Sequence, residues 1–500
     1  MNVQIIANPD RELYSKYFRD ESKLETSKID YLFLPNNRDE LVESIKYCYE
    51  KGLEITISGG KTGVTAGSVP LNGGAVISVH NLNKIDNFDS AHKTIAVECG
   101  VTLNALNQLL SEKSEGLIFP VDPTESWASI GGLVANNASG SRSYLYGSMR
   151  DWVRSIEVIL PNGEVVNIRR GESLVRNNKV EIKGNSSQFL IDVLSINKPD
   201  AKNSIGYVYS EGSDLIDLFI GSEGTLGVVT SITLGLVSAP SYQVLIVQFL
   251  NSDQQVVEFV NRLKSQSEYT IQALEYADEC SLRIVKNSAI ALDNKLIQNL
   301  NESHKGCVYL EYVGTEEEFA DFYQFLEDVC EDIKVDINHS FVGMDDSEIR
   351  DIKAFRHAIP ETVNSIIAKR AKEFPGLHKL STDMSLPFDQ LGWSLDYYRE
   401  FLNNNNFEFV MFGHIGQAHL HINLMPRDLS ELSKAKQLYL EMAREVVAKG
   451  GAVSAEHGIG RIKKAFLEVQ YKKEEIDQMK KIKLTLDPKN LLNKGVLFDI

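Results

Sequence analysis

Apolar and polar positions in the first half of the chain change between the spacing of short strands and that of helices. Residues 39–50 have the spacing of an amphipathic helix, with acidic residues at its start and Gly52 as its stop. Residues 54–58 and 94–98 predict strands, and a leucine stripe over 103–110 predicts a helix. Short strands alternating with helices indicate an α/β organisation in this half.

Longer elements follow in the second half. A strand is predicted at 242–250 and a helix at 253–266, and a similar pair repeats at 308–313 and 316–331. This order suggests an antiparallel or mixed sheet that carries its helices on one face. Two further helices are predicted at 428–449 and 473–486.

The clearest boundary between two domains lies at Pro240. Proline restricts both itself and the preceding residue to extended geometry, which suits a connection between domains. We therefore expect an N-terminal domain over residues 1–238 and a C-terminal domain over residues 239–500. Residues 169–203 are polar and rich in Ser, Asn and Lys, so they are interpreted as an insertion, with a little structure of its own near 189–194.

The composition narrows the class of protein. The chain has 500 residues, of which 43% are hydrophobic and 24% charged, as in a globular protein of two or three domains. A balance of 52 Lys and Arg against 69 Asp and Glu gives a net charge of −17, which disfavours nucleic acid and anionic membranes as partners. The five cysteines lie far apart, which indicates neither a disulfide framework nor a cysteine-bound iron–sulfur cluster. Without an apolar run of about 20 residues or a signal-peptide pattern, we expect a cytoplasmic protein with no transmembrane segment.

Four glycine-dense segments of the first half carry the first chemical signal. They lie at 58–67, 120–142, 146–151 and 219–230, and the first directly follows a predicted strand. Glycines allow backbone N–H groups to approach a pyrophosphate closely. The first segment has neither the Walker A spacing nor the GxGxxG pattern, so alone it is also compatible with a simple tight turn.

Together and in this order, the segments resemble the flavin-binding domain of the vanillyl-alcohol oxidase and p-cresol methylhydroxylase (PCMH) superfamily. The resemblance implies an α+β fold, in which a PCMH-type FAD-binding domain of two α+β subdomains precedes an FAD-linked oxidase C-terminal α+β domain. It also implies an extended FAD, with its pyrophosphate on the first loop and its isoalloxazine at the junction with the second domain. The cofactor-binding residues that it implies are Ser58, Gly59, Gly60, Lys61, Thr62, Gly63, Pro120, Asp122, Gly131, Gly132, Asn136, Ser139, Gly140, Gly221, Gly224, Gly227, Val228 and Asn493.

The first loop also bears on how the flavin is held. Some members of the superfamily attach it covalently through a histidine directly after the glycine pair of this loop. Lys61 stands at that position here, so we expect non-covalent FAD. Lys61 itself is either a neighbour of the phosphates or a solvated side chain.

Three of the ten histidines, His414, His419 and His421, lie within eight positions. In an extended segment His419 and His421 share a face because side chains alternate, and His414 reaches the same point if Gly416 allows a turn. Glu456 follows about forty residues later on a loop rich in glycine. Two histidines and one carboxylate are a common set of ligands for a divalent metal, although their spacing does not choose between zinc, iron and manganese.

From residue 241 onward the chain resembles the FAD-linked 2-hydroxy-acid dehydrogenases, a group that includes D-lactate dehydrogenases, glycolate oxidase subunits and D-2-hydroxyglutarate dehydrogenases. A guanidinium is the side chain best suited to hold a substrate carboxylate. Zinc is the metal that we expect first. By position, the resemblance implies His414, His421 and Glu456 as metal ligands and His457 as the catalytic base. It also implies Arg356, Lys379 and Asn423 as substrate-binding residues, and it places the segment of Lys379 and Asp383 near the flavin.

The sequence departs from the pattern of this group near the expected ligands. Gln417, Ala418 and His419 stand where the group usually has Asp, Gly and Asn. Ala455 likewise replaces the common glycine before the glutamate, and Lys494 replaces a proline. We expect the metal ligands to be retained and the lining of the pocket to differ.

These features predict an FAD-dependent dehydrogenase that oxidises a small anionic D-2-hydroxy acid to the 2-oxo acid. Flavin N5 takes the hydride, while the metal and His457 promote loss of the hydroxyl proton. The sequence contains no nicotinamide fingerprint and no iron–sulfur motif, so an external acceptor is expected, such as a quinone, an electron-transfer flavoprotein, a cytochrome or a dye, with oxygen less favoured. A homodimer is one oligomeric state that the sequence allows.

Other functions stay open. The histidines and the glutamate would also serve a metal-dependent hydrolase, although that function leaves the four glycine-dense segments unexplained. The departures at residues 417–419 are compatible with a flavin-binding subunit that no longer catalyses oxidation. A sugar or lactone oxidase of the same superfamily is disfavoured, because those enzymes commonly have the covalent-attachment histidine and lack the histidine pair.

Overall fold

A small sheet forms at the N-terminus of the chain. The computed structural model describes residues 3–193, 196, 198–207, 209–288 and 294–500. Strands β1 (Gln4–Ala7), β2 (Tyr31–Leu34), β4 (Ala75–Ser78) and β3 (Ile55–Ser58) lie in this order, and the last three are parallel. Helix α1 (Arg38–Lys51) connects β2 to β3 and ends at Gly52, whose φ is +67°. The predicted helix and strand of this region are confirmed.

A second, five-stranded sheet is antiparallel throughout and has the order β5, β6, β12, β8, β9. Helices α2 and α3 lie against this part of the molecule, and α2 begins where the Thr102 hydroxyl accepts a hydrogen bond from the Ala105 N–H. The strands are β5 (Ile85–Asp89), β6 (Thr94–Glu98), β8 (Val153–Ile159), β9 (Val165–Arg169) and β12 (Val228–Gly235). The helices are α2 (Leu103–Lys113), α3 (Ile130–Ala135), α4 (Ser143–Tyr146), α5 (Met149–Trp152) and α6 (Ile216–Phe219). Two short strands, β7 (Leu117–Ile118) and β13 (Val237–Ser238), form a separate antiparallel pair.

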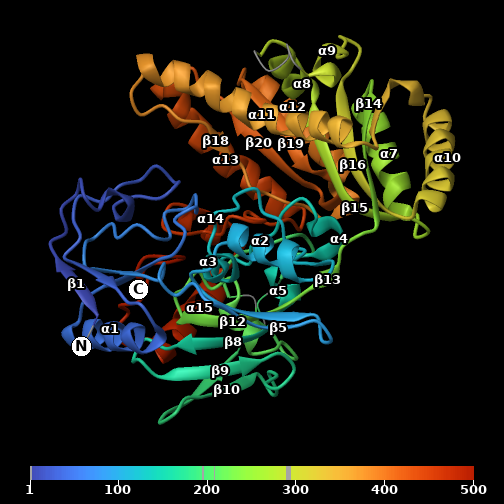
Figure 1. The fold of residues 1–500 in the computed structure, drawn as a ribbon. Coiled ribbons are helices and arrows are strands. Elements are labelled where there is room, and N and C mark those ends of the chain that lie inside the picture. The colour runs from blue at the N-terminus through green and yellow to red at the C-terminus, as the bar shows by residue number, and fades with distance from the viewer. Residues whose placement is uncertain (1–2, 194–195, 197, 208, 289–293) are drawn as a thin grey trace.

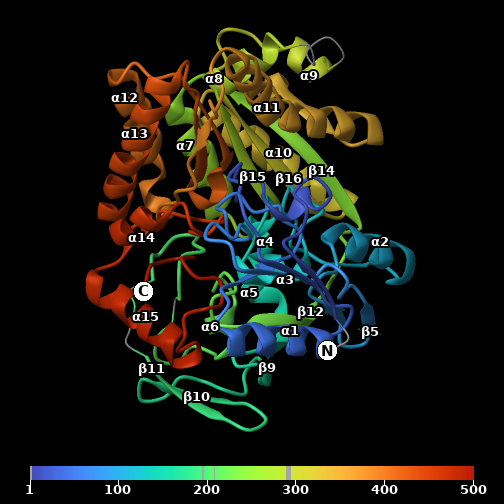
Figure 2. The same cartoon turned by 90° about the vertical axis from the view of Figure 1, so that its left-hand side faces the viewer.

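The predicted insertion has structure of its own, as expected. Strands β10 (Lys179–Lys183) and β11 (Gln188–Asp192) form an antiparallel hairpin at the edge of the molecule (Figures 1 and 2). Residue 194, the end of the expected structured stretch, lies outside the described residues. The hairpin rests on the C-terminal part of the chain, where the Gln478 side chain donates a hydrogen bond of 2.5 Å to the carbonyl of Asp192.

The C-terminal half is built on a seven-stranded sheet in which every pair of neighbours is antiparallel. Its order is β17, β14, β16, β15, β19, β20, β18. The strands are β14 (Tyr242–Leu250), β15 (Thr270–Asp278), β16 (Gly306–Gly314), β17 (Ser340–Gly343), β18 (Leu380–Ser381), β19 (Phe409–His414) and β20 (His419–Leu424). The helices are α7 (Asp253–Ser265), α8 (Glu279–Lys286), α9 (Lys295–Gln298), α10 (Glu316–Asp332), α11 (Asp346–Glu373), α12 (Leu391–Asn404) and α13 (Leu429–Ala448).

Helices cover both faces of this sheet, so the expectation of helices on one face is wrong. Along β14, Val244 and Ile246 pack into the core beneath α7 and α10, whereas Leu245 and Val247 pack beneath α8 and α11. Figure 2 shows the two helix layers on either side of the strands. The physical reason is visible in the strand itself, which is apolar at successive positions and therefore has no face suited to water. Among the described residues, no helix combines the length and apolar character needed to cross a bilayer.

The end of the chain returns to the N-terminal half. After α14 (Lys464–Gln470) and α15 (Lys473–Leu486), residue Leu492 forms a parallel bridge with Ile55 of β3. Asn493 donates its backbone N–H to the Ile55 carbonyl at 2.7 Å, and its side chain bonds the Ile57 N–H and the Glu223 carbonyl, each at 3.0 Å. The red C-terminal helices accordingly lie beside the lower half of the molecule in both views (Figures 1 and 2).

A buried lysine on α15 holds the C-terminal segment against the N-terminal half. Lys483 pairs with Asp487 at 2.6 Å and donates to the carbonyls of Thr225 and Leu492, each at 2.7 Å. We expect Lys483→Ala to lower the free energy of unfolding by about 3–5 kcal/mol, because it leaves a carboxylate buried without its cation. Urea unfolding measures the change. Lys473→Ala, which breaks an exposed ion pair on the same helix, should leave the midpoint of urea unfolding unchanged. Equal shifts of the midpoint in both variants would contradict the role of Lys483.

Candidate active site

A cavity of about 500 Å³ lies where the two halves of the molecule meet. On one side its wall consists of the first glycine-dense loop, the N-terminal part of α3 with the residues around it, and the loop before β12. On the other side, strands β15, β16, β19 and β20, helix α11 and the loop that carries Glu456 complete the wall. The cavity therefore brings together both groups of residues that the sequence singled out.

The first glycine-dense loop presents bare backbone to this cavity. No described residue accepts a hydrogen bond from the backbone N–H groups of residues 61–65. Gly60 lies so close to the next segment that a Cβ would stand 2.8 Å from the carbonyl oxygen of Trp127, whereas a Cβ on Gly63 would meet open space. Unpaired N–H groups on a concave wall are well suited to the oxygens of a pyrophosphate, so the loop fits the expected FAD.

Lys61 is not a freely solvated side chain. Its ammonium donates to the carbonyl of Gly59 at 3.2 Å and lies 5.3 Å from the centre of the Tyr17 ring. Burial, followed by the nearby Lys16, lowers the pKa of Lys61. Lys61 lies on the cavity wall, and its role as a neighbour of the phosphates stays a prediction.

Most of the expected cofactor-binding residues lie on the cavity wall, but four do not. Asp122 instead holds the second loop, because its carboxylate accepts hydrogen bonds from the Ser141 hydroxyl at 2.9 Å and the Arg142 N–H at 3.0 Å. The residues on the wall are Gly59, Gly60, Lys61, Thr62, Gly63, Gly131, Gly132, Asn136, Ser139, Gly140, Gly224, Gly227, Val228 and Asn493. Ser58, Pro120, Asp122 and Gly221 lie outside it, as do Lys379 and Asn423 of the expected substrate site.

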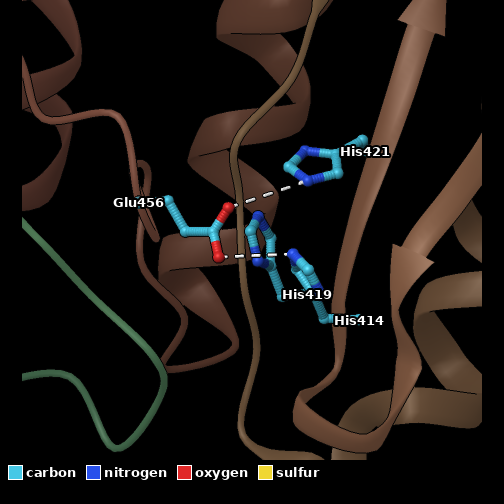
Figure 3. Close-up of side chains that lie close together, drawn as sticks. All are labelled: His414, His419, His421 and Glu456. Atoms are coloured by element: carbon cyan, nitrogen blue, oxygen red, sulfur yellow. Dashed lines mark ion pairs between the residues drawn. The ribbon is translucent and has the colours of Figure 1, made fainter. Parts of the chain in front are cut away.

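The three clustered histidines lie on one face of the β19–β20 hairpin (Figure 3). Ring centres are 5.1 Å apart for His414 and His419, and 4.5 Å apart for His419 and His421. The turn between the strands depends on Ala418, whose φ is +48°, and not on Gly416 as expected. Gly416 is required for another reason, because a Cβ there would lie 2.6 Å from the Tyr144 ring.

Glu456 faces two of these histidines in a geometry that suits a metal ion. Its Oε1 lies 3.2 Å from His414 Nε2, and its Oε2 lies 3.9 Å from His421 Nε2. The opposite ring nitrogens are held from behind, His414 Nδ1 by Glu275 at 2.5 Å and His421 Nδ1 by the Thr382 carbonyl at 3.3 Å. Metal-binding histidines typically have such partners, which aim the free nitrogen at the ion. The residues present therefore fit the expected divalent metal.

Burial and neighbouring charges shift the pKa values of His414, His421 and Glu456. Burial opposes a charge on His414, but Glu275 and Glu456 outweigh it and raise the His414 pKa to about 9. Burial lowers the pKa of His421 well below its ordinary value. Burial also opposes ionisation of Glu456, yet Lys202 and His414 hold its pKa well below the usual range. A divalent cation would take the place of the proton on His414, so its binding releases protons.

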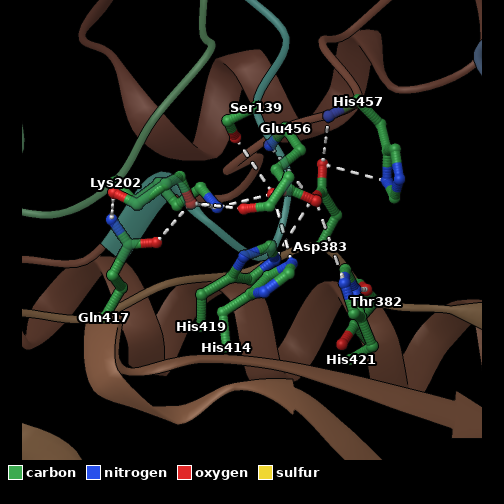
Figure 4. A network of polar contacts seen from close by, with 12 residues as sticks. Ser139, Lys202, Thr382, Asp383, His414, Gln417, His419, His421, Glu456 and His457 are labelled. Atoms are coloured by element: carbon green, nitrogen blue, oxygen red, sulfur yellow. Dashed lines mark hydrogen bonds and ion pairs between the residues drawn. The ribbon is translucent and has the colours of Figure 1, made fainter. Parts of the chain in front are cut away.

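Lys202 is a site residue that the sequence analysis missed. Its ammonium lies 2.5 Å from Glu456 Oε1 and donates to the Ser143 hydroxyl at 2.8 Å (Figure 4). Ser139, from the second glycine-dense segment, donates to the same glutamate oxygen at 3.0 Å. Lys202 belongs to the polar segment interpreted as an insertion, and a single lysine in such a segment carries no signal that could have identified it.

His457 is positioned by Asp383. The buried Asp383 carboxylate accepts from the His457 backbone N–H at 2.9 Å and lies 3.4 Å from His457 Nδ1 (Figure 4). It is also 3.2 Å from the ammonium of Lys463. Burial would raise the pKa of Asp383, but His457 and Lys463 hold it well below its usual range. A carboxylate on Nδ1 leaves Nε2 of His457 as the nitrogen able to exchange a proton in the cavity.

Arg356 lines the cavity from helix α11 but already has a carboxylate partner. Its Nε and one terminal nitrogen donate to Glu275 at 3.0 and 2.9 Å. Glu275 thus connects Arg356 to His414, and the sequence analysis missed it. Glu275 interrupts the apolar run of Ala273, Leu274, Tyr276 and Ala277 in strand β15, and this interruption is the signal that could have identified it. The remaining guanidinium donors stay available for a ligand.

Sequence profiles of known families match both halves of the chain. The profile described as "FAD linked oxidases, C-terminal domain" matches residues 239–497, and the profile described as "FAD binding domain" matches residues 29–169. The second match supports the expected FAD cofactor.

Similar proteins are found over nearly the whole length. Glycolate oxidase subunit GlcD of Bacillus subtilis is 28% identical over 98% of this chain and 93% of that protein. D-lactate dehydrogenase of Anaerostipes hadrus is 29% identical over 91% of this chain and 87% of that protein. D-2-hydroxyglutarate dehydrogenase of Xanthomonas citri is 28% identical over 97% of this chain and 92% of that protein.

Solved structures agree on the fold. The crystal structure of p-cresol methylhydroxylase with substrate bound superposes with a TM-score of 0.70 at 14% identity, covering 99% of this chain and 94% of that one. An alkyldihydroxyacetonephosphate synthase gives a TM-score of 0.67 at 14% identity, covering 98% and 82%. The expected α+β fold of the PCMH type is therefore confirmed.

Proposed function

Because this chain belongs to the family of FAD-linked oxidases, we propose that it oxidises a D-2-hydroxy acid to the 2-oxo acid at the cavity described above. The observation that carries the proposal is the shared cavity itself. One wall offers unpaired backbone N–H groups for FAD, and the other offers Arg356, His457 and the cluster around Glu456. The similar proteins are named for glycolate, D-lactate and D-2-hydroxyglutarate. These names support a small 2-hydroxy acid as the substrate.

Bound FAD would supply an acceptor for the hydride from the substrate carbon. The task of this chain is then to hold the substrate and to remove its hydroxyl proton. Arg356 binds the carboxylate through the donors that Glu275 leaves free. His457 accepts the proton on Nε2, and Asp383 keeps its imidazole in the required orientation and stabilises the charge that forms.

A divalent ion held by His414, His421 and Glu456 would lower the pKa of the substrate hydroxyl as a Lewis acid. Glu275 and Thr382 keep the two imidazoles turned toward that position. Lys202 and Ser139 hold the Glu456 carboxylate from the side of the flavin-binding half. Zinc is the ion proposed first. An external acceptor such as a quinone, an electron-transfer flavoprotein or a cytochrome would be needed to reoxidise bound FAD.

The proposal predicts a yellow protein whose colour depends on the substrate. Purified protein should show flavin absorption, and acid precipitation should release the chromophore into the supernatant because the attachment is non-covalent. Under anaerobic conditions a D-2-hydroxy acid should bleach the flavin bands, whereas its L-enantiomer should not. A colourless protein that hydrolyses esters or amides would support the hydrolase, and a yellow protein that no 2-hydroxy acid bleaches would support a non-catalytic flavin-binding subunit.

A second assay tests the metal. A panel of D- and L-2-hydroxy acids is measured with a dye acceptor, with and without a chelator. We expect the chelator to abolish turnover and one divalent ion to restore it. Full turnover after complete removal of metal would reject the metal-assisted step and leave the flavin reaction in place.

A further inference from the structure

We propose that His419 is an additional ligand of the divalent ion, so that three histidines and one glutamate hold it. This inference rests on the proposed metal centre and extends it to a residue at which the sequence departs from the pattern it resembles. Asn is usual at this position in that pattern, and an asparagine does not present an imidazole nitrogen.

The positions of the side chains carry the inference. One ligand atom each from His414, His419, His421 and Glu456 can be chosen so that all four lie within 4.8 Å of one another. Two nitrogens on opposite sides of one zinc ion lie about 4.2 Å apart, twice a metal–nitrogen bond. Only a small contraction therefore brings all four groups onto one ion. Figure 3 shows the His419 ring between Glu456 and the strand that carries His414.

The Asp383 carboxylate beside the His419 ring also serves His457 and Lys463. The His419 side chain is fully buried, with an exposed fraction of 0%. Its Nε2 lies 3.3 Å from Asp383 Oδ1, whereas Nδ1 makes no hydrogen bond with any part of the chain that the structure describes. Leaving a buried polar group unpaired is costly, and such groups in native proteins often face an ion or a water. A metal ion would satisfy the lone pair of this imidazole.

A fourth protein ligand changes which ions and substrates the centre can accept. Three protein ligands and a 2-hydroxy acid bound through two oxygens make five donors, which zinc accepts. With His419 the total is six, which is the number typical of manganese and other ions with octahedral preference. The extra nitrogen also strengthens the hold on the ion when no substrate is present.

The test compares the affinity of the holoenzyme for metal in the wild type and in His419→Asn. Asn is chosen because it stands at this position in the pattern that the chain resembles, so the hairpin is expected to fold. Each protein is stripped of metal with its FAD retained and then titrated with Co²⁺ and Zn²⁺ in competition with a chromophoric chelator. We expect the variant to bind either ion at least ten-fold more weakly. We also expect its Co²⁺ absorption bands to change in position and intensity, because the ion loses one nitrogen ligand.

His304→Asn is the matched control. His304 is likewise a buried histidine of the C-terminal half, but it stacks on Phe249 at 4.4 Å and does not belong to the group of His414, His419, His421 and Glu456. It should bind Co²⁺ as the wild type does. Unchanged affinity and an unchanged Co²⁺ spectrum in His419→Asn would overturn the role of His419 while the proposed centre stands. Wild-type holoenzyme that binds neither ion would overturn both, and flavin bleaching by a D-2-hydroxy acid would then show that the oxidation itself survives.

Discussion

Replacing His457 by alanine is expected to lower kcat about 10³-fold and to leave FAD bound. A positioned general base contributes about 10² to 10⁴ in rate, and His457 lines the cavity with its imidazole beside the buried carboxylate of Asp383. The glycine-dense loops are the proposed site of the flavin, so its binding should not depend on this side chain. Stopped-flow bleaching of the flavin by a D-2-hydroxy acid measures the effect on the chemical step directly.

The control for this experiment is His378→Ala. His378 is exposed, and within the described part of the chain its side chain hydrogen-bonds the carbonyl of Gly376, so its loss should change neither bleaching nor turnover. Bleaching at a near-normal rate in His457→Ala would reject His457 as the base. In that event the proton would have to leave through another group at the cavity.

Glu456→Gln is expected to abolish metal binding and to lower turnover by about 10³-fold or more at metal concentrations that saturate the wild type. The change keeps the shape of the side chain and removes its charge. The Lys202 ammonium, now 2.5 Å from a carboxylate oxygen, would then stand beside the ion without a compensating carboxylate. Loss of several kcal/mol of transition-state stabilisation corresponds to about a thousand-fold in rate.

Elemental analysis after dialysis measures the metal content of Glu456→Gln, and its flavin absorption reports whether the cavity still holds FAD. Glu408→Gln is the matched control, because Glu408 pairs with Arg370 away from the cavity and should retain metal and turnover. A Glu456→Gln enzyme with full metal content would exclude this glutamate as a required ligand. Absence of metal combined with normal turnover would instead exclude the metal from the reaction.

Much of the local structure could be predicted because side-chain periodicity depends only on the backbone. The strands at 94–98 and 242–250 and the helix at 473–486 match β6, β14 and α15. Helix caps are equally local, as Thr102 shows at the start of α2. The apolar run at residues 244–247 of β14 indicates a strand that is buried on both faces, so it could have predicted helices on both faces of the sheet.

Part of the site could be predicted in the same way. The short spacing of His414, His419 and His421 placed them on one hairpin, and the structure confirms that they share a face. The positions of the glycines predicted a loop that presents backbone, which residues 61–65 do. In both cases the interacting residues are close in sequence, so local geometry suffices.

The amino-acid sequence by itself determined the order of strands and helices, the bare loops and the histidine hairpin, because each depends on residues a few positions apart. Only the tertiary structure brought Lys202 to Glu456 across 254 positions and Glu275 to His414 across 139 positions. Such contacts depend on how the sheets and helices pack against one another, and no spacing along the chain encodes that packing. The cavity exists for the same reason, since its walls come from segments that meet only when the two halves of the protein fold together.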